Sequence, residues 1–231
     1  MRKTSTVLIL GATGRLGAAC TKAFAGAGWQ VIAQTRKPTT GKLPDGVSAL
    51  VTGDSPCSRS TAKLHHVDVV VHAMNPAYTN AAWVAHVPAM MASNIEIAQS
   101  LNATLMFPGN VYNFGAGMPG SLDETAAQIP TTVKGKLRVD VELELECATQ
   151  TSELRATVIR AGDFFGGGHG SMFDQVTVSK IRKGTFTRSG PIDVRTPWAY
   201  LPDLAQTFVR VAESAPACGY GQCVGHQLGN T

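Results

Sequence analysis

Short apolar runs alternate with longer, alanine- and leucine-rich stretches along the chain as far as residue 161. The runs are continuous instead of alternating with polar residues, which is typical of strands buried on both faces of a parallel sheet. They predict strands over residues 6–10, 30–34, 47–51, 67–73, 104–107 and 155–160. The stretches between them predict helices over residues 15–27, 85–101 and 136–150. Strands alternating with helices imply βαβ units, so we predict an α/β fold, a Rossmann-type doubly wound parallel sheet.

Beyond residue 161 the pattern loosens. Residues 162–170 contain five glycines and predict a loop, whereas 171–182 and 202–214 predict helices, the second with Pro202 in its first turn. Residues 219–231 are glycine-rich and hold few core residues. We therefore expect one main domain over residues 1–165 and a small region over 166–231 that packs closely on it.

Composition adds limits. Hydrophobic residues make up 44% and charged residues 16% of the 231 residues, which is typical of a globular chain. The net charge of +4 comes from scattered basic residues, and a nucleic-acid partner is not expected because such binders concentrate their basic residues in a stripe.

Five cysteines at irregular spacing argue against a disulfide framework and against a metal site. The apolar run Val7 to Leu10 stops at Gly11 and is too short for a signal peptide. No stretch approaches the roughly 20 apolar residues of a membrane span. We expect a cytoplasmic protein without a membrane partner.

The strongest motif is the glycine-rich turn GATGRLG, residues 11–17, between the first predicted strand and the first predicted helix. Gly11 allows a tight turn, Gly14 lets the backbone approach a pyrophosphate, and Gly17 lets the helix pack closely on the strand. The N-terminus of the helix offers N–H groups to the phosphates. The spacing is GxxGxxG, not the more common GxGxxG, and the alternative is a plain turn.

Arg36 follows the second strand, where sites specific for NAD carry an acid for the ribose hydroxyl. An arginine binds a 2′-phosphate instead, and Arg15 in the turn can assist. The expected cofactor is therefore NADP(H), with NAD possible; the alternative is that these are solvated charges.

With later segments, these residues resemble the extended and atypical short-chain dehydrogenase/reductase superfamily, and most closely its NAD-dependent epimerase/dehydratase type. The segments that carry the resemblance are 11–17, 51–54, 69–76, 107–115, 158–166 and 197–205. The resemblance implies that residues 1–165 form the NAD(P)-binding domain and that 166–231 lie on the substrate side. It assigns the cofactor to Gly11, Thr13, Gly14, Arg15, Leu16, Gly17, Arg36, Asp54, Ala73, Met74, Asn75, Pro108 and Lys136.

The chain departs from the family at its catalytic residues, a tyrosine four residues before a lysine and a serine on the fifth strand. Lys136 fits the lysine, but the tyrosine position falls on Thr132 and the serine position on Asn110. A threonine hydroxyl is a much weaker acid than a phenol. Tyr112 is the candidate substitute, with packing or substrate stacking as its alternative; an exposed helix-start lysine is the alternative for Lys136. We interpret Asp163 as a loop acid.

Two functions remain open. One is an NAD(P)-dependent oxidoreductase or epimerase/dehydratase with an atypical site, acting on a small molecule such as a sugar nucleotide or a carbonyl compound. The other is a non-catalytic NADP(H)-binding sensor or regulator. The substrate-side region is short, so the pocket is small and open, a partner completes it, or the sequence is truncated. The resemblance implies a homodimer formed through the helices predicted over residues 85–101 and 136–150. The first of them carries apolar residues suited to an interface, namely Met90, Met91, Ile95 and Leu101.

Overall fold

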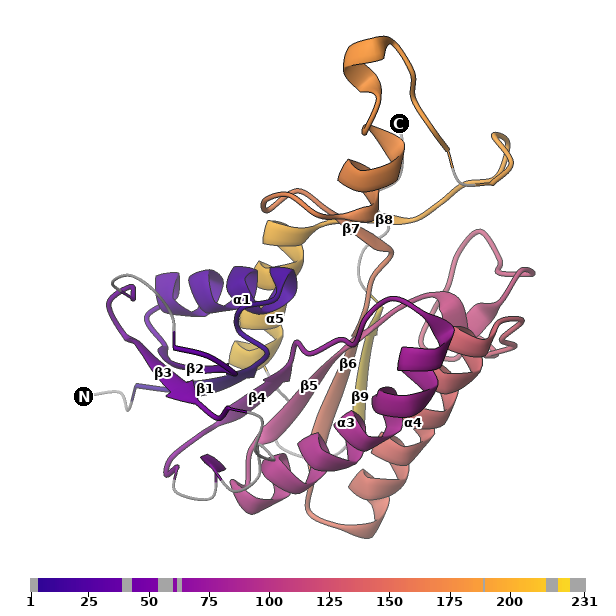
Figure 1. Ribbon diagram of the computed structural model, residues 1–231. Helices are drawn as coiled ribbons and strands as arrows, with labels where there is room; N and C mark the ends of the chain where they lie inside the picture. Colours follow the sequence, from indigo (N-terminus) through magenta and orange to yellow (C-terminus); the bar gives the residue numbers. More distant parts are fainter. Residues whose placement is uncertain are drawn as a thin grey trace.

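The computed structural model describes residues 4–38, 43–53, 60–61, 64–188, 190–214 and 220–224. In these residues seven strands form one parallel sheet in the order β3-β2-β1-β4-β5-β6-β9 (Figure 1). Their bounds are β1 Thr6–Leu10, β2 Gln30–Thr35, β3 Val47–Val51, β4 Val69–His72, β5 Thr104–Gly109, β6 Arg155–Arg160 and β9 Tyr220–Val224. The strand order reverses between β1 and β4, which is the switch point where such sheets bind ligands. The predicted fold class is confirmed.

Helices cover both faces of the sheet. Helices α1 (Arg15–Gly26) and α5 (Leu201–Ser214) lie on one face, and α3 (Asn80–Ser100) and α4 (Val133–Thr151) on the other (Figure 1). Each face has its own apolar core: Val7 and Ile9 of β1 belong to the first, and Leu8 and Leu10 to the second. Burial on both faces explains why β1 is apolar at consecutive positions. Among the described helices, none is both long and apolar enough to cross a membrane.

Helices α3 and α4 begin earlier than the sequence predicts. Both start after a threonine cap: the Thr79 hydroxyl accepts a hydrogen bond from Ala82 N, and the Thr132 hydroxyl accepts one from Gly135 N. Pro88 lies inside α3. These caps satisfy backbone donors of the first turn, which outweighs the weaker apolar pattern of these residues.

The interface argument for a homodimer is wrong at two of its four residues. Met91 and Ile95 are buried within the chain's own core, and Met90 and Leu101 are partly buried. The face of α3 that carries Met91 and Ile95 packs on the sheet and is not left free.

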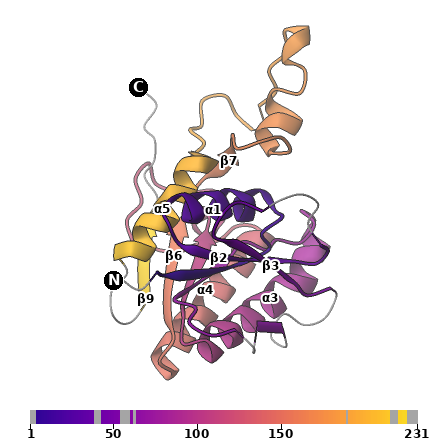
Figure 2. The same ribbon diagram turned by 90° about the vertical axis from the view of Figure 1, so that its left-hand side faces the viewer.

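A second part protrudes from the sheet's carboxyl edge (Figures 1 and 2). Its short strands β7 (Asp163–Phe165) and β8 (Trp198–Tyr200) pair in parallel, so the loop expected over 162–170 contains a strand. The helix expected over 171–182 is wrong: the segment forms a π-helical turn, η2 (Phe173–Thr177), and a 3-10 turn, η3 (Ile181–Lys183).

Two segments beyond residue 165 contribute to the layers of the main sheet. Helix α5 packs beside α1 (Figure 2), and β9 pairs with β6 at the sheet's edge. The glycine-rich end was not predicted to form a strand, because its sequence lacks the apolar run that marks the other strands.

Candidate active site

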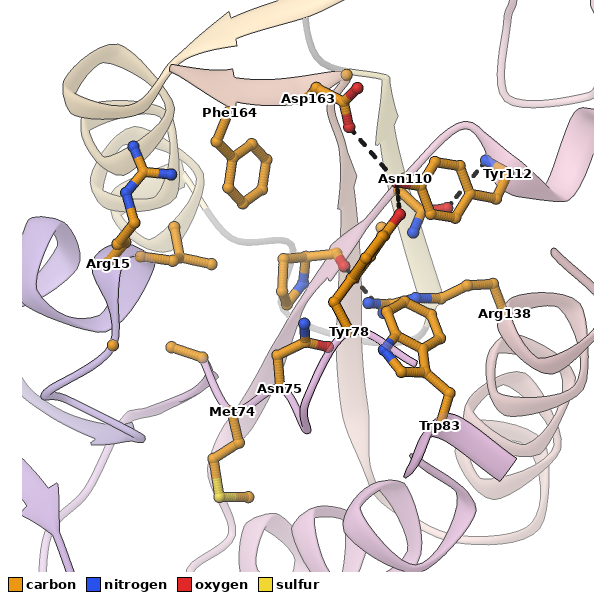
Figure 3. A pocket seen from close by; sticks show the side chains of 16 residues that line it. Arg15, Met74, Asn75, Tyr78, Trp83, Asn110, Tyr112, Arg138, Asp163 and Phe164 are labelled. Carbon is orange, nitrogen blue, oxygen red and sulfur yellow. Dashed lines mark hydrogen bonds between the residues drawn. The ribbon is translucent and has the colours of Figure 1, made fainter. Parts of the chain in front are cut away.

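A cavity of about 350 Å³ opens at the carboxyl edge of the sheet. The loops after β1, β4, β5 and β6 line it, together with side chains from α3 and α4 (Figure 3). The lining residues are Gly14, Arg15, Leu16, Ala73, Met74, Asn75, Tyr78, Trp83, Pro108, Gly109, Asn110, Tyr112, Arg138, Gly162, Asp163 and Phe164. The cavity therefore joins the glycine-rich turn to the loop that carries Asn110 and Tyr112.

The glycine-rich turn has the backbone geometry that its sequence predicts. Gly11 has a φ of 81°, and a Cβ there would lie 2.9 Å from Met74 Cγ. A Cβ at Gly17 would lie 2.2 Å from the Gly11 carbonyl oxygen, so the helix and the turn approach too closely for any side chain. Gly14 lies at the helix N-terminus in an extended conformation.

Gln34, which the sequence analysis missed, braces this turn from the end of β2. Its side-chain oxygen accepts a hydrogen bond from Gly11 N at 2.9 Å, and its amide nitrogen donates to the Thr52 hydroxyl at 2.8 Å. Gln34 is buried. The available signal was a glutamine that directly follows the apolar residues 31–33 of this strand.

Only some of the residues that the sequence assigns to the cofactor line the cavity. Arg15 lines the cavity, and its guanidinium donates to the Gly166 carbonyl oxygen at 2.7 Å. Arg36 is exposed just after β2 and does not line the cavity, and Thr13 is also exposed. Asp54 lies outside the described residues.

Two of the four expected catalytic residues lie in the cavity. Asn110 and Tyr112 line it, and Asn110 Oδ1 accepts a hydrogen bond from Tyr112 N at 2.9 Å. Thr132 instead caps α4 and is exposed, and Lys136 is exposed outside the lining.

Arg138, not Lys136, brings a cation to the cavity. Successive helical residues turn by about 100°, so positions 136 and 138 face roughly opposite directions. The guanidinium carbon lies 4.9 Å from the Trp83 ring centroid and 5.0 Å from that of Phe107. Burial lowers the pKa of Arg138 to about 10 despite the opposing effect of Glu142. The group therefore stays charged at neutral pH.

Arg138 has no ion-pair partner among the described residues. Glu142, one turn further along α4, pairs with Arg160 instead. Arg138 Nη1 donates to the Pro108 carbonyl oxygen at 3.4 Å, and within the described part of the chain its Nε has no hydrogen-bond partner. Such a group favours an anion or an electron-rich oxygen in the adjacent cavity.

Tyr112 shares its hydroxyl with two further cavity residues. Its oxygen lies 2.5 Å from the Tyr78 hydroxyl and 3.4 Å from Asp163 Oδ1. Burial, and then the charge of Asp163, raise the pKa of Tyr112 above its ordinary value, whereas Arg138 lowers it. Burial also raises the pKa of Asp163. Tyr112 is therefore a neutral phenol, able to pass on a proton but unsuited to act as a phenolate base.

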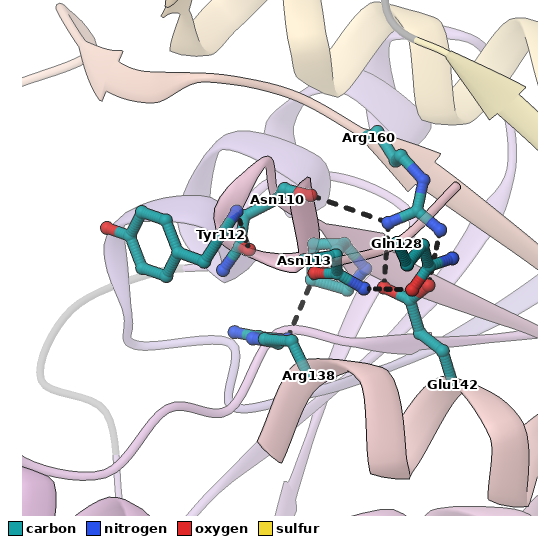
Figure 4. A network of polar contacts seen from close by, with 8 residues as sticks. Asn110, Tyr112, Asn113, Gln128, Arg138, Glu142 and Arg160 are labelled. Atoms are coloured by element: carbon teal, nitrogen blue, oxygen red, sulfur yellow. Dashed lines mark hydrogen bonds and ion pairs between the residues drawn. The ribbon is translucent and has the colours of Figure 1, made fainter. Parts of the chain in front are cut away.

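A polar network beneath the cavity fixes the Asn110–Tyr112 loop (Figure 4). The buried Arg160 side chain pairs with Glu142, and its Nη1 donates to the Asn110 carbonyl oxygen at 3.4 Å. Asn113 Nδ2 donates to Gln128 Oε1 at 2.8 Å. These contacts hold the loop at Asn110 and at Asn113, the middle residue of the 3-10 turn η1 (Tyr112–Phe114).

His72 is a core residue, as its position on a buried strand predicts. Its Nδ1 meets Asn94 Nδ2, and its ring packs edge-on against Phe107. Burial, and secondarily the charge of Arg138, lower the pKa of His72 to about 3. The ring is neutral at physiological pH.

A second cavity of about 160 Å³ lies in the protruding part. Its walls are mostly apolar or aromatic: Asp163, Met172, Phe173, Val176, Thr177, Phe186, Arg188, Thr196 and Trp198. Asp163 lines both cavities, so it is more than the plain loop acid that the sequence indicated. The sequence analysis also missed Tyr78, Trp83 and Arg138, because each of them reaches the cavity only through tertiary packing.

Comparison with known proteins gives a family and a fold. The model of the NAD dependent epimerase/dehydratase family matches residues 7–219. A search of curated proteins finds no significant match.

Several solved structures share the fold at low identity. UDP-glucose 4-epimerase from Brucella ovis, in complex with NAD, superposes with a TM-score of 0.79 at 15% identity, covering 96% of this chain and 77% of its own. UDP-N-acetylglucosamine 4-epimerase from Bacillus cereus superposes with a TM-score of 0.76 at 13% identity, and the match covers 96% of this chain and 78% of that enzyme's chain. UDP-N-acetylglucosamine 4-epimerase from Methanobrevibacter ruminantium M1, in complex with UDP-N-acetylmuramic acid, superposes with a TM-score of 0.73 at 18% identity. This match covers 100% of this chain and 78% of that enzyme's chain.

Proposed function

The chain belongs to the NAD dependent epimerase/dehydratase family, and from this premise we propose that it is an NADP(H)-dependent enzyme that oxidises or reduces an alcohol or carbonyl carbon. One observation carries the proposal: a single cavity runs from the glycine-rich turn to the polar loop of Asn110 and Tyr112. A dinucleotide needs the first and a reacting carbon the second.

The residues present fit a dinucleotide. The turn leaves its backbone open where a pyrophosphate must approach, and a Cβ at Gly14 would stand 3.3 Å from the Gly11 oxygen. Arg15 adds a cation beside the N-terminus of α1, and Ala73, Met74 and Asn75 line the adjoining wall. When bound, the nicotinamide would supply or accept a hydride.

NADP(H) is proposed over NAD(H) because the residues that end and follow β2, Thr35 and Arg36, carry no carboxylate. Thr35 is buried there, with its hydroxyl donating to the Lys37 carbonyl oxygen at 2.8 Å, while Arg36 stands exposed beside it. An exposed guanidinium is free to pair with a 2′-phosphate.

The proposed reactive groups differ from the family pattern. Arg138 takes the part that the sequence assigned to Lys136, Asn110 orients the reacting oxygen, and Tyr112 takes part in proton transfer. The contacts of Arg138 with the cavity, and the exposure of Lys136 and Thr132, support this choice. Sugar nucleotides are the proposed substrates, since several structural neighbours are UDP-sugar epimerases.

A non-catalytic NADP(H) sensor is the second candidate. The raised pKa of Tyr112 favours it, because an enzyme of this kind needs a group that exchanges protons readily. A homodimer and a cytoplasmic location remain predictions.

Calorimetry with NADPH and NADH, followed by assays of UDP-glucose and UDP-N-acetylglucosamine with NADP⁺, tests the proposal. Tight NADPH binding with measurable conversion of either sugar supports the enzyme. Binding at micromolar concentration, without turnover on these or on simple ketones and aldehydes, supports the sensor. Failure to bind either dinucleotide would overturn both.

A further inference from the structure

Three oxygen-bearing side chains meet in the cavity from three separate loops (Figure 3). Tyr78 lies between β4 and α3, Tyr112 begins η1 after β5, and Asp163 begins β7 after β6. The two hydroxyls are 2.5 Å apart, at the short end of O–H···O hydrogen bonds, and Tyr112 lies 3.4 Å from Asp163. The second link is long, as catalytic hydrogen bonds often are before a ligand binds.

The chemistry of the three groups gives the chain a direction. An ionised carboxylate only accepts hydrogen bonds, so Tyr112 donates to Asp163. The Tyr112 oxygen then accepts from Tyr78, and the Tyr78 oxygen keeps lone pairs that can accept a proton. Tyr78 is 52% exposed and lines the cavity, whereas Tyr112 is partly buried. The accessible end of the chain is therefore Tyr78.

Tyr78 is held in place despite its exposure. The Lys134 ammonium lies 4.5 Å from its ring centroid and is itself anchored by a hydrogen bond of 2.8 Å to Asn80 Oδ1. The Trp83 ring packs edge-on against Tyr78, with centroids 5.7 Å apart. A cation over one face and an aromatic edge fix the direction of the hydroxyl.

We propose that Tyr78, Tyr112 and Asp163 form a proton relay that carries the proton of a substrate hydroxyl bound at Tyr78 to the carboxylate of Asp163. The relay rests on the proposed function. The substrate O–H proton passes to the Tyr78 oxygen, the Tyr78 proton to Tyr112, and the Tyr112 proton to Asp163. The substrate carbon gives up its hydrogen with the electron pair to NADP⁺, and a carbonyl compound, NADPH and a protonated Asp163 result. Reduction runs the same steps in reverse.

A relay agrees with the electrostatics of the site. Burial and the charge of Asp163 raise the pKa of Tyr112, and Arg138 offsets only part of this effect. In a concerted transfer neither phenol has to exist as a phenolate, because each gives up one proton while it takes another. Asp163 is the final acceptor, and its hydrogen bond from Tyr112 lowers its pKa against the raising effect of burial.

NMR of protein labelled with ¹³C at tyrosine Cζ tests whether the chain exists. The sequence has four tyrosines, so single variants assign the signals. Tyr112 should stay protonated through the range near pH 10 in which a free phenol titrates. Asp163→Asn should lower its titration midpoint by about one pH unit or more, because it removes a negative charge beside the phenol, whereas Tyr78→Phe should raise the midpoint, because it removes a hydrogen bond that stabilises the phenolate. Tyr200→Phe, which removes a partly exposed hydroxyl outside the cavity, should leave it unchanged.

A Tyr112 signal that is indifferent to both Tyr78→Phe and Asp163→Asn would overturn the relay, whatever the protein's activity proves to be. Its use in catalysis is tested with NADP⁺ and UDP-glucose, or whichever alcohol the wild type oxidises. Tyr78→Phe should lower turnover by about 10²–10⁴-fold with the Kd of NADPH unchanged. A loss below tenfold with the NMR coupling intact would also overturn the relay. Failure of the proposed function is recognised separately, in wild-type protein that binds no dinucleotide or transfers no hydride.

Discussion

Glu142 on α4 binds Arg160 on β6 through both carboxylate oxygens, with the two side chains 3% and 2% exposed. This pair joins a helix to the sheet directly beneath Asn110, whose carbonyl oxygen accepts a hydrogen bond from Arg160. A buried charge that loses its partner is strongly unfavourable. The pair therefore anchors the loop that carries the candidate catalytic residues.

Glu142→Ala should lower the free energy of unfolding by about 3–5 kcal/mol, because it leaves the Arg160 guanidinium buried and unpaired. Urea denaturation measures the change. Glu213→Ala is the matched control, since Glu213 pairs with Arg210 at 3.5 Å on the surface and such pairs contribute about 0–1 kcal/mol. Equal effects of the two substitutions would contradict the anchoring role.

Gly17→Ala should destabilise the protein and weaken NADPH binding together. Its Cβ would stand 2.2 Å from the Gly11 oxygen, which is backbone and cannot move without distorting the turn. Gly26→Ala in the same helix is the control: a Cβ there meets nothing within 4 Å, and alanine favours a helix by up to about 1 kcal/mol. Thermal denaturation and calorimetry compare them, and a neutral Gly17→Ala would refute the close approach.

Arg36→Ala should weaken NADPH binding by about 1.5–3 kcal/mol, the contribution of a hydrogen bond to a charged group, and leave NADH binding almost unchanged. Lys37→Ala, an exposed neighbour, serves as the control. Calorimetry with both cofactors measures the difference. If wild-type protein binds NADPH and NADH equally, the preference for the phosphorylated cofactor is wrong.

Arg138→Gln and Lys136→Gln distinguish the roles of these two cations of α4. The first removes the charge that lines the cavity and should lower turnover by about 10²–10³-fold, as for other electrostatic groups in active sites. The second changes an exposed side chain and should have little effect. Steady-state kinetics with the accepted substrate give the comparison, and the opposite ranking would restore Lys136 to the site.

His72 should make the protein less stable in mild acid. Its pKa falls from 6.5 to about 3 on folding, so between these two pH values His72 is protonated in the unfolded chain and neutral in the folded chain. Stability contributed by neutral His72 is complete above pH 6.5 and declines as the pH falls towards 3, at about 1.4 kcal/mol per pH unit. Urea denaturation of wild type and His72→Gln across this range tests the slope, with His65→Gln as an exposed control. Parallel curves for wild type and His72→Gln would contradict it.

The sequence by itself determined strands β1 to β6 of the sheet and the glycine-rich turn, but not β9. Both depend on local properties that a short stretch of sequence shows, namely apolar runs such as Val7–Leu10 and the conformational freedom of Gly11. The sequence also identified Asn110 and Tyr112, which line the cavity because the carboxyl ends of parallel strands meet at one edge of the sheet.

Only the tertiary structure decided which other side chains enter the cavity. The helical phase of α4 turns Arg138 inward and Lys136 outward, and that phase follows from how the helix packs on the sheet. Tyr78 and Tyr112 meet across 34 residues of sequence, and Tyr112 and Asp163 across 51. Contacts between residues so distant in sequence depend on how loops and helices pack against the sheet, and no local sequence pattern predicts that packing.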